Sequence, residues 1–552
     1  MLSPRAGGRA AALMVLALSG AACGAGNGSS RYELAATQRF RFPITNDIGE
    51  FDPALITAES DVELGRNVFE GLLKPADDLA VVPAIAEKLP EISPDGLTYT
   101  FTLKKDITFS NGDPVTAADF IYSWSRVPRL KKGFVEGAAP IVGFDAVRAG
   151  SSQTLSGLSA PDDHTLVVKL AKKAVRFTNL VATWSLWVVD RKVVEADPDR
   201  WWTRPETAVG TGPFKLSART PGRSLDFVAN DSYRGRPRPL LSSVHVEVVA
   251  DQSTAIKRYE EGQFDDVGYG GQSTLPPDDA LRYQDDPVHR GELTKTAKGR
   301  TTWVGLNLEK GPFAGLTGPG LLLRKAFSEA IDRKQLADRA CSSALQCTPA
   351  TGGYITRNLH GYLGDGEDSS ARFSPAEARK DLRAGDPDGS RTRGLHYTFN
   401  RSDANKAVAD SLVSQWKTNL GIDVAEEPLE RDAFFDGRDA KGYIAFRHSW
   451  GADYDHPQEW YDSLFVTGAA SGGSGYSNPK FDSLVQDADG KPLQEALPIY
   501  RQAAAILASD QVAIPLVYSL GTYLNKPYVQ GAGSNPLFDN YWTSIRILRH
   551  SA

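Results

Sequence analysis

The chain has 552 residues, a formal net charge of −6 and a charged fraction of 24%. This slightly acidic balance offers no broad basic surface of the kind that binds nucleic acid. A chain this long is too large for one hydrophobic core, so it is expected to divide into lobes or domains.

The first 30 residues read as a targeting segment. Arg5 and Arg9 give a positively charged start, and residues 10–22 form an apolar run that is too short to cross a bilayer comfortably. Residues 1–22 are therefore predicted to be a secretory signal peptide. No later segment approaches 18 uninterrupted apolar residues, so the remainder is expected to be soluble and outside the cytoplasm.

Cys23 follows Gly20-Ala21-Ala22 directly and precedes a flexible tract, residues 24–30. The junction resembles a bacterial lipobox, in which the cysteine is diacylated and becomes the mature N-terminus. Gly20 stands where that motif usually has leucine. The resemblance implies lipidation at Cys23, with residues 23–30 as a lipidated tether to the cell membrane. The alternative is a freely secreted protein in which Cys23 has no role.

Residues 96–127 show the local patterns most clearly. Apolar side chains alternate with threonine and lysine over residues 97–103, which predicts a half-buried strand. A turn sequence follows at 111–114. Thr116 stands three residues before Asp119, an approximate capping box that opens a helix through Trp124.

Helices and strands are predicted to alternate along the rest of the chain. Helical patterns cover residues 321–340, 402–420 and 493–510, and strand patterns cover 224–230, 243–249, 302–308, 443–450 and 513–519. Interleaved elements favour α/β lobes. Long connections around 268–300 and 350–372 are expected to run over the surface between the lobes.

Two further cysteines, Cys341 and Cys347, lie six residues apart. In an oxidising compartment they could close a short loop as a disulfide. A metal site is less favoured there, because a CxxC spacing and a second pair of ligands are missing.

Six stretches together resemble the family of extracytoplasmic solute-binding proteins of peptide, nickel and related ABC importers. They occur in order between about residues 45 and 547, namely 51–74, 82–126, 209–235, 303–336, 475–485 and 512–531. The resemblance implies a two-lobe α/β fold of the periplasmic-binding-protein type (type II, class C), with a hinge and an extra subdomain in the first lobe. A monomer is also implied, with a permease and an ATPase as partners and without a cofactor.

The resemblance also implies where the chain passes between the lobes. The expected segments are lobe I over 31–73, 204–298 and 512–552, an extra subdomain over 74–203, and lobe II over 299–511.

The stretch FRHSWGADYDHPQEW, residues 446–460, places one acid between two aromatic side chains. Around it the chain resembles the oligopeptide binders, in which the aspartate of a Trp-x-Ala-Asp-Tyr run pairs with the ligand's α-ammonium group. Carried over, that residue is Asp453, with Trp450, Gly451 and Tyr454 beside the ligand. A zwitterion in a closed cleft needs both ends paired, because burying an isolated ion costs several kcal/mol.

Arg447 occupies a place where the oligopeptide binders have an arginine near the ligand's carboxylate, so it is expected to pair with that charge. Purely structural roles remain as alternatives: Asp453 could cap the turn, and Arg447 could pair with a nearby acid. Main-chain bonds from residues 46–55, which include Glu50, are expected to hold an extended ligand. Tyr476 and Tyr518 are expected to line the cleft or to belong to the core.

Enzyme signatures are not found. The sequence has no GxSxG, HExxH or GxxxxGK[ST] motif, and residues 210–214 fit a tight turn into a strand better than a phosphate loop. Four potential metal ligands occur close together, at His448, Asp453, Asp455 and His456. Their spacing across a turn does not make them converge, so no metal is predicted.

The sequence therefore predicts a non-enzymatic lipoprotein that binds short peptides and delivers them to an ABC importer. Two alternatives remain: a protein for another cationic or amino-bearing solute (a dipeptide, an opine-like compound or an oligosaccharide), and a peptide-sensing signalling lipoprotein.

Overall fold

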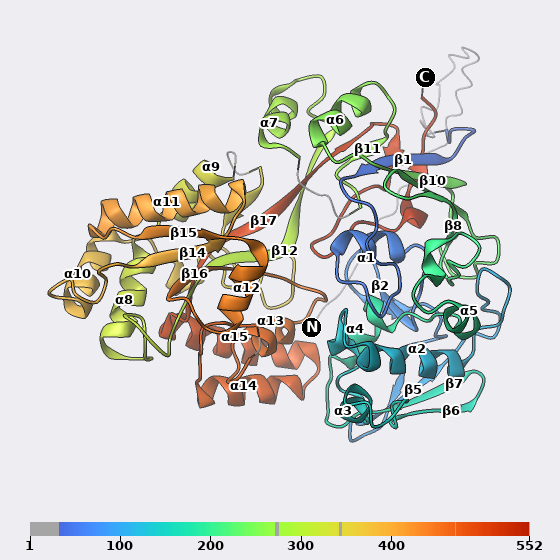
Figure 1. Cartoon of the computed structure of the whole chain (residues 1–552), viewed down its shortest axis with the longest axis horizontal. Helices are drawn as coiled ribbons and strands as arrows, with labels where there is room; N and C mark the ends of the chain where they lie inside the picture. The colour runs from blue at the N-terminus through green and yellow to red at the C-terminus, as the bar shows by residue number, and fades with distance from the viewer. Residues whose placement is uncertain (1–32, 271–274, 342–344, 470, 551–552) are drawn as a thin grey trace, which may run out of the picture.

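A computed structural model describes residues 33–270, 275–341, 345–469 and 471–550. The predicted signal peptide and the tether with Cys23 lie outside these residues. Within the described ranges, no helix is both long and apolar enough to cross a membrane. The chain forms two bodies connected by the long strands β12 (Leu293–Leu306) and β17 (Ala513–Asn525) (Figure 1). We call the body with β1 to β11 and the C-terminal residues the first lobe, and the body built between β12 and β17 the second lobe.

A four-stranded sheet forms one part of the first lobe. Its order is β1 (Arg39–Ile44), β10 (Ser243–Val248), β9 (Ser224–Ala229) and β8 (Phe214–Thr220), with β1 parallel to β10 and the other pairs antiparallel. Phe42 and Phe227 are fully buried beneath it. Both rings pack edge-on against Trp542, which comes from the C-terminal segment. The end of the chain thus completes the core of this lobe.

The turn predicted at 210–214 leads into β8 at Phe214, as expected. A Cβ added to Gly210 would lie 2.1 Å from the carbonyl oxygen of Val68, and one added to Gly212 would lie 2.7 Å from it. The two glycines are needed because the backbone of the neighbouring segment passes this close.

A second, smaller sheet carries its own core. Its order is β4 (Glu91–Ile92), β5 (Thr98–Thr102), β7 (Thr165–Lys169) and β6 (Leu158–Asp162), and α2 (Ala117–Leu130) lies beside it. The predicted capping box is confirmed, since the Asp119 carboxylate accepts hydrogen bonds from the Thr116 amide and hydroxyl, both at 2.8 Å. Trp124 is fully buried and donates from Nε1 to the carbonyl oxygen of Leu186 at 2.9 Å.

The remaining elements of the first lobe are short. They are β2 (Leu73–Pro75), β3 (Val81–Pro83), β11 (Asp266–Val267), β18 (Val529–Gln530), β19 (Arg546–Ile547), α1 (Glu59–Gly65), α3 (Phe144–Arg148), α4 (Phe177–Val181), α5 (Arg191–Ala196), α6 (Gln252–Glu260), α7 (Pro277–Asp285), η1 (Val135–Gly137), η2 (Trp184–Leu186), η3 (Trp201–Thr203) and η5 (Trp542–Ser544).

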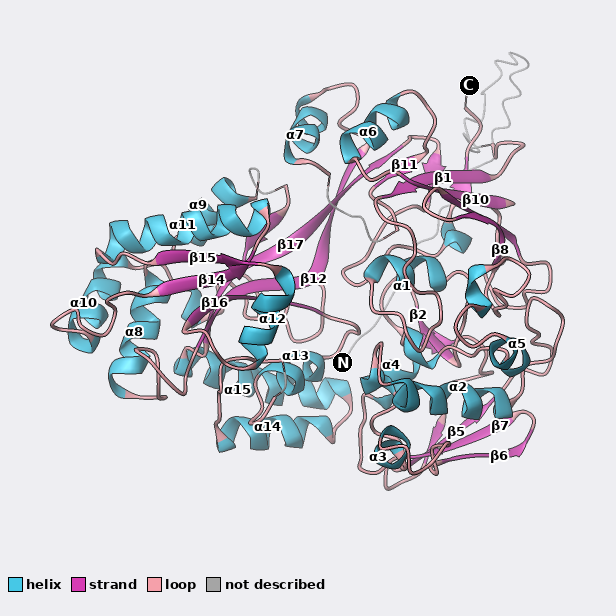
Figure 2. Cartoon of the chain, viewed as in Figure 1, coloured by secondary structure: helices cyan, strands magenta, loops and turns pink. Residues whose placement is uncertain are grey.

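A seven-stranded sheet forms the centre of the second lobe and extends through its edge strand β11 into the first lobe (Figure 2). Its order is β11, β17, β12, β16 (Ala445–Gly451), β14 (His396–Asn400) and β15 (Ala425–Leu429), and β13 (Cys347–Pro349) pairs with β17. Its helices are α8 (Gly318–Glu329), α9 (Arg333–Ala340), α10 (Pro375–Gly385), α11 (Asp403–Leu420), α12 (Arg431–Asp439), α13 (Pro457–Leu464), α14 (Pro479–Asp489) and α15 (Leu493–Asp510), with η4 (Ser369–Ala371). Trp303 and Trp416 are among the largest fully buried side chains of this core.

The predicted helices at 402–420 and 493–510 are confirmed by α11 and α15. The pattern at 321–340 is divided into α8 and α9, because the Asp332 carboxylate caps a new helix by accepting from the amides of Lys334 and Gln335, both at 3.0 Å. The expected connection at 268–300 is wrong in part, since it contains α7 and the first half of β12. Cys341 and Cys347 form a disulfide.

Strands β12 and β17 carry the chain between the lobes. Their antiparallel register shifts between Ala297 and Thr301, which is an irregularity of the kind that bends a strand pair. The two strands pair with each other on both sides of this shift. On the side of the second lobe β12 also pairs with β16, and at the other end β17 pairs through Leu524 with β11 of the first lobe. Strand β13 pairs with β17 over Val517–Ser519, so this part of β17 belongs to the sheet of the second lobe. The expected segment boundaries of the two lobes remain predictions.

Candidate functional site

A cavity of about 690 Å³ lies between the two lobes. This size is within the range of about 300–1,000 Å³ that is usual for small-ligand sites. The first lobe contributes residues from 56–66, 75–81, 133–134, 179–187 and 536–541, the second lobe contributes residues from 451–455, and the hinge contributes 298–300 and 519–520. A guest in this cavity therefore contacts both lobes.

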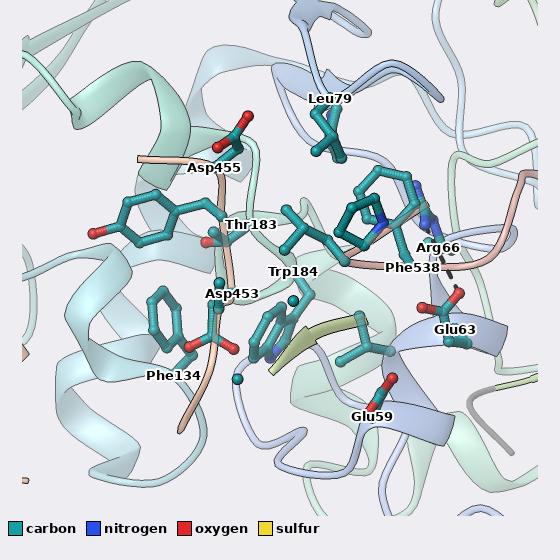
Figure 3. Close-up of a pocket in the computed structure, with 18 of the residues that line it drawn as sticks. Glu59, Glu63, Arg66, Leu79, Phe134, Thr183, Trp184, Asp453, Asp455 and Phe538 are labelled. Carbon is teal, nitrogen blue, oxygen red and sulfur yellow. Dashed lines mark ion pairs between the residues drawn. The ribbon is translucent and has the colours of Figure 1, made fainter. Parts of the chain in front are cut away.

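Asp453 lies in the loop that leaves β16 and lines the cavity. Its carboxylate makes no hydrogen bond and no ion pair with any described residue, and Figure 3 shows it beside the rings of Phe134 and Trp184. Burial raises the pKa of Asp453 to about 7. The Arg300 charge opposes this rise, while the charges of Glu136 and Glu59 add to it. The site thus holds a partly desolvated acid with room for a cation.

The loop around Asp453 is held from behind by α13. The Asp453 amide donates to Glu459 Oε1 at 3.3 Å, and Glu459 is buried at the start of that helix. Burial raises the pKa of Glu459 well above its ordinary value, and the Asp453 charge raises it further. His456 caps the same helix by accepting from the Gln458 amide at 3.2 Å. Asp453 is therefore positioned by main chain, which leaves its side chain free for the cavity.

Two aromatic side chains of the first lobe face this loop. The rings of Phe134 and Trp184 lie 5.1 Å apart, and Trp184 Nε1 donates to the carbonyl oxygen of Ile56 at 3.2 Å. Gly133 has a φ of +64°, and a Cβ there would lie 2.7 Å from the carbonyl oxygen of Ala54, so this close approach sets the course of the chain into Phe134. Aromatic faces next to a carboxylate form a wall that suits an organic cation.

A separate charged group closes the other end of the cavity, where Figure 3 places Arg66, Glu63 and Phe538 away from Asp453. The Arg66 Cζ lies 3.6 Å from the centroid of the Phe538 ring and 3.8 Å from that of Tyr541. Arg66 Nη1 lies 3.8 Å from Glu63 Oε2. Arg66 Nη1 also donates to the carbonyl oxygen of Asp539 at 3.1 Å, whereas Nη2 is buried without a hydrogen-bond partner among the described residues. Because Arg66 is held between two aromatic rings, this end serves chiefly as a structural wall.

The two lobes also meet at the rim of the cavity. Arg176, at the start of α4, forms an ion pair with Asp462 of α13, with 2.8 Å between Nη1 and Oδ2. Tyr454 of the second lobe packs among the core residues of the smaller sheet of the first lobe. These contacts connect the loop that carries Asp453 to the opposite lobe.

Three of the predicted ligand-binding residues line the cavity: Gly451, Asp453 and Tyr454. Trp450 and Arg447 do not line it. Trp450 is half-buried against the core of the second lobe. Arg447 points toward β14, where Nη1 donates to Asn400 Oδ1 at 3.3 Å, and no acid of the described chain forms an ion pair with it.

The other predicted residues also lie outside the cavity lining. The Tyr476 hydroxyl donates to Asp510 Oδ2 at 2.8 Å within the core, and the Tyr518 hydroxyl donates to the carbonyl oxygen of Gly353 at 2.8 Å. Glu50 Oε1 accepts from the amides of Phe51 and Asp52, at 3.0 and 2.9 Å. These three side chains stabilise the local chain.

The potential metal ligands do not converge among the described residues. His448 stacks on Trp303 at 4.5 Å, and burial lowers its pKa to about 3. Asp455 accepts from the His360 amide at 2.7 Å and contacts His360 Nδ1 at 2.7 Å. His448 thus belongs to the core beside β16, whereas Asp455 holds the loop against His360.

Sequence reasoning missed the cavity residues of the first lobe and the hinge, among them Phe134, Trp184 and Arg300. They lie about 150 to 320 residues before Asp453 in the sequence. No local pattern distinguishes them from core aromatics or surface arginines. They come together only in the folded chain, where they line one cavity.

A two-lobed α/β protein with a strand hinge and an interlobe cavity belongs to the class that closes around a ligand. Residues 80–472 match the bacterial extracellular solute-binding proteins, family 5 (middle). The chain belongs to this family, as the ordered stretches indicated.

Individual relatives cover nearly the whole chain. It is 27% identical over 533 residues to the periplasmic murein peptide-binding protein MppA of Escherichia coli K12, with 94% of each covered. It is also 27% identical over 522 residues to the periplasmic oligopeptide-binding protein OppA of Haemophilus influenzae, covering 91% of this chain and 92% of that one.

Solved structures agree with the fold. The unliganded open form of MppA superposes with a TM-score of 0.80 at 26% identity, covering 94% of this chain and 99% of that one. Haemophilus influenzae OppA in complex with the peptide RPPGFSPFR gives 0.74 at 25% identity, covering 94% and 100%. The expected two-lobe α/β fold is confirmed.

Proposed function

We propose that the protein binds short peptides in the interlobe cavity and delivers them to the permease of an ABC importer, with Asp453 pairing with the α-ammonium group. The carrying observation is the Asp453 carboxylate, which lines the cavity without a partner among the described residues. The relatives named for murein peptides and oligopeptides support peptides as the ligand class. Delivery to a permease and its ATPase follows from the family and rests on no contact in this chain.

The energetics favour an ammonium ligand. A carboxylate that is already desolvated gains a charge-assisted hydrogen bond worth about 1.5–3 kcal/mol when a cation arrives. Phe134 and Trp184 would exclude water from the pair and add cation–π attraction. Residues 46–55 do not line the cavity, whereas Ile56 and Thr57, which follow them directly, do. We therefore propose that main chain from 56–57 contacts the ligand.

Calorimetry with trialanine and N-acetyl-trialanine tests this function. The free peptide is expected to bind at least about 100-fold more tightly, because acetylation removes the charge that Asp453 needs. Native mass spectrometry of the purified protein identifies the natural ligand. Several bound masses that fit short peptides would support peptide import. One defined mass would indicate a dedicated solute, and a protein without a bound ligand would indicate a signalling role.

Peptide affinity is also expected to depend on pH. Because the pKa of Asp453 in the free protein is about 7, protons compete with the ammonium group below that value. Affinity should fall by up to about tenfold per pH unit below pH 7, and should fall again above the α-amino pKa of roughly 8. Calorimetry from pH 5.5 to 9 should therefore show a maximum between 7 and 8.

The Asp453→Asn variant is the control for this profile, since it cannot titrate at that position. It should lose the fall below pH 7 and keep the fall above pH 8. An unchanged affinity of the unmodified protein between pH 5.5 and 7.5 would contradict the assignment of Asp453.

A lipid anchor at Cys23 would keep the protein at the outer face of the cell membrane, close to its permease. This proposal rests on the sequence around Cys23, which lies outside the described residues. We likewise propose that the protein acts as a monomer.

A further inference from the structure

Three cationic side chains line the cavity: Arg66, Lys298 and Arg300. Two of them already lie near acids of the first lobe, since Arg66 is 3.8 Å from Glu63 and Lys298 Nζ is 3.6 Å from Asp539 Oδ1. Arg300 makes no ion pair or hydrogen bond with any residue that the structure describes, and it is exposed to the cavity. It is the cation that remains available to a guest.

The sheet places Arg300 close to Asp453. Arg300 on β12 pairs directly with Gly451 on β16, at the point where the chain leaves the sheet for the Asp453 loop. A Cβ at position 451 would lie 2.9 Å from Arg300 Nη2 and 3.0 Å from its Cζ. The guanidinium group therefore lies over Gly451, in space that any other residue would fill. Glycine at this position makes room for the arginine.

Asp453 follows Gly451 by two residues, a backbone distance of about 7 Å in an extended chain. The guanidinium over Gly451 and the carboxylate of Asp453 thus form a pair of opposite charges on the same wall of the cavity. Each residue of an extended peptide spans about 3.3–3.6 Å, so two or three residues cover about 7–11 Å between the terminal charges.

We propose that Arg300 binds the α-carboxylate of the bound peptide and thereby fits the site to ligands of two or three residues. This inference rests on the proposed function, because it takes Asp453 as the partner of the ammonium end. A planar guanidinium with its donors unoccupied can bind a carboxylate through two parallel hydrogen bonds. Longer peptides would carry their carboxylate past Arg300 and gain nothing from it.

Other basic residues fit this role less well. Arg447 points away from the cavity toward Asn400. Arg66 is enclosed between two aromatic rings, and Lys298 donates to Ser534 Oγ at 3.2 Å beside Asp539. A ligand carboxylate at either of these groups would have to compete with an acid that is already in place.

The test compares free-acid and C-terminally amidated alanine peptides of two, three and five residues by calorimetry. The unmodified protein is expected to bind the free acid of the di- and tripeptide at least about tenfold more tightly than the matching amide. For the pentapeptide the difference between acid and amide should be less than about threefold.

In Arg300→Gln the preference for the short acids over their amides should fall below about threefold, with the affinity for the amides unchanged. Lys295→Gln is the matched control, because it removes a cation from the same strand outside the cavity and should keep the full preference.

Two results would overturn the role of Arg300: a preference for the short acids that persists in Arg300→Gln, or an equal loss of affinity for acids and amides. A tenfold preference for the pentapeptide acid would overturn the length assignment. The proposed function has a separate readout, since peptides that bind equally well with and without an N-terminal acetyl group would refute the role of Asp453. In that case the inference about Arg300 falls with it.

Discussion

Replacing Asp453 with asparagine is expected to weaken the binding of short peptides by about 3–5 kcal/mol, which is roughly two to three and a half orders of magnitude in Kd. The change keeps the shape of the side chain but removes its charge. The ligand's ammonium group would then be buried beside a neutral amide, between Phe134 and Trp184 and without a counter-ion. Calorimetric titration of trialanine into the variant measures the loss.

Asp487→Asn serves as the control for this experiment, because Asp487 is an exposed acid of the same lobe that pairs with Lys491. It should bind trialanine like the unmodified protein. A loss of less than about tenfold in Asp453→Asn, with a normal melting temperature, would mean that Asp453 does not meet the ammonium group.

The second large effect is expected on stability. Asp52 is fully buried, and its carboxylate accepts from Arg126 Nη1 at 2.9 Å and from Trp201 Nε1 at 3.1 Å. Asp52→Ala would leave the buried Arg126 guanidinium without its counter-ion, which should lower the free energy of unfolding by about 3–5 kcal/mol. Chemical denaturation of the purified variant, followed by tryptophan fluorescence, measures the change.

This ion pair also matters for the site. Asp52 anchors the segment that reaches the cavity at Ile56, so its loss should weaken peptide binding as well. Glu195→Ala, which breaks the exposed pair with Arg191, is the control and should change stability by less than about 1 kcal/mol. A stability loss in Asp52→Ala no larger than that of Glu195→Ala would contradict the structural role of the buried pair.

Much of the fold could be predicted from the sequence, because helix caps and hydrophobic periodicity specify the same elements that the packing of the lobes stabilises. The capping box at Thr116 and the long helix at 403–420 are fixed by capping and periodicity within one segment. The strands β12 and β17 were predicted too short. Their hinge halves, such as 293–297, carry polar residues without a clear strand pattern and are extended because they pair with each other between the lobes.

The residues of the candidate site could be predicted only where they are neighbours in the sequence. Asp453 and Tyr454 were found because the run around them resembles a known family. For Tyr476 and Tyr518 the sequence left the cleft and the core open as alternatives, and their hydroxyl groups bond to polar atoms of the core. Arg447 bonds instead to Asn400 at the end of β14, a residue far from it in the sequence, so the local pattern around Asp453 could not reveal this contact.

A crystal structure of the protein with a bound tripeptide tests the pairing at Asp453 most directly. We expect the peptide's amino nitrogen within about 3.2 Å of an Asp453 carboxylate oxygen, with the peptide enclosed by both lobes. A peptide whose amino end lies elsewhere, or an Asp453 side chain turned to solvent or to a protein cation in the complex, would contradict it.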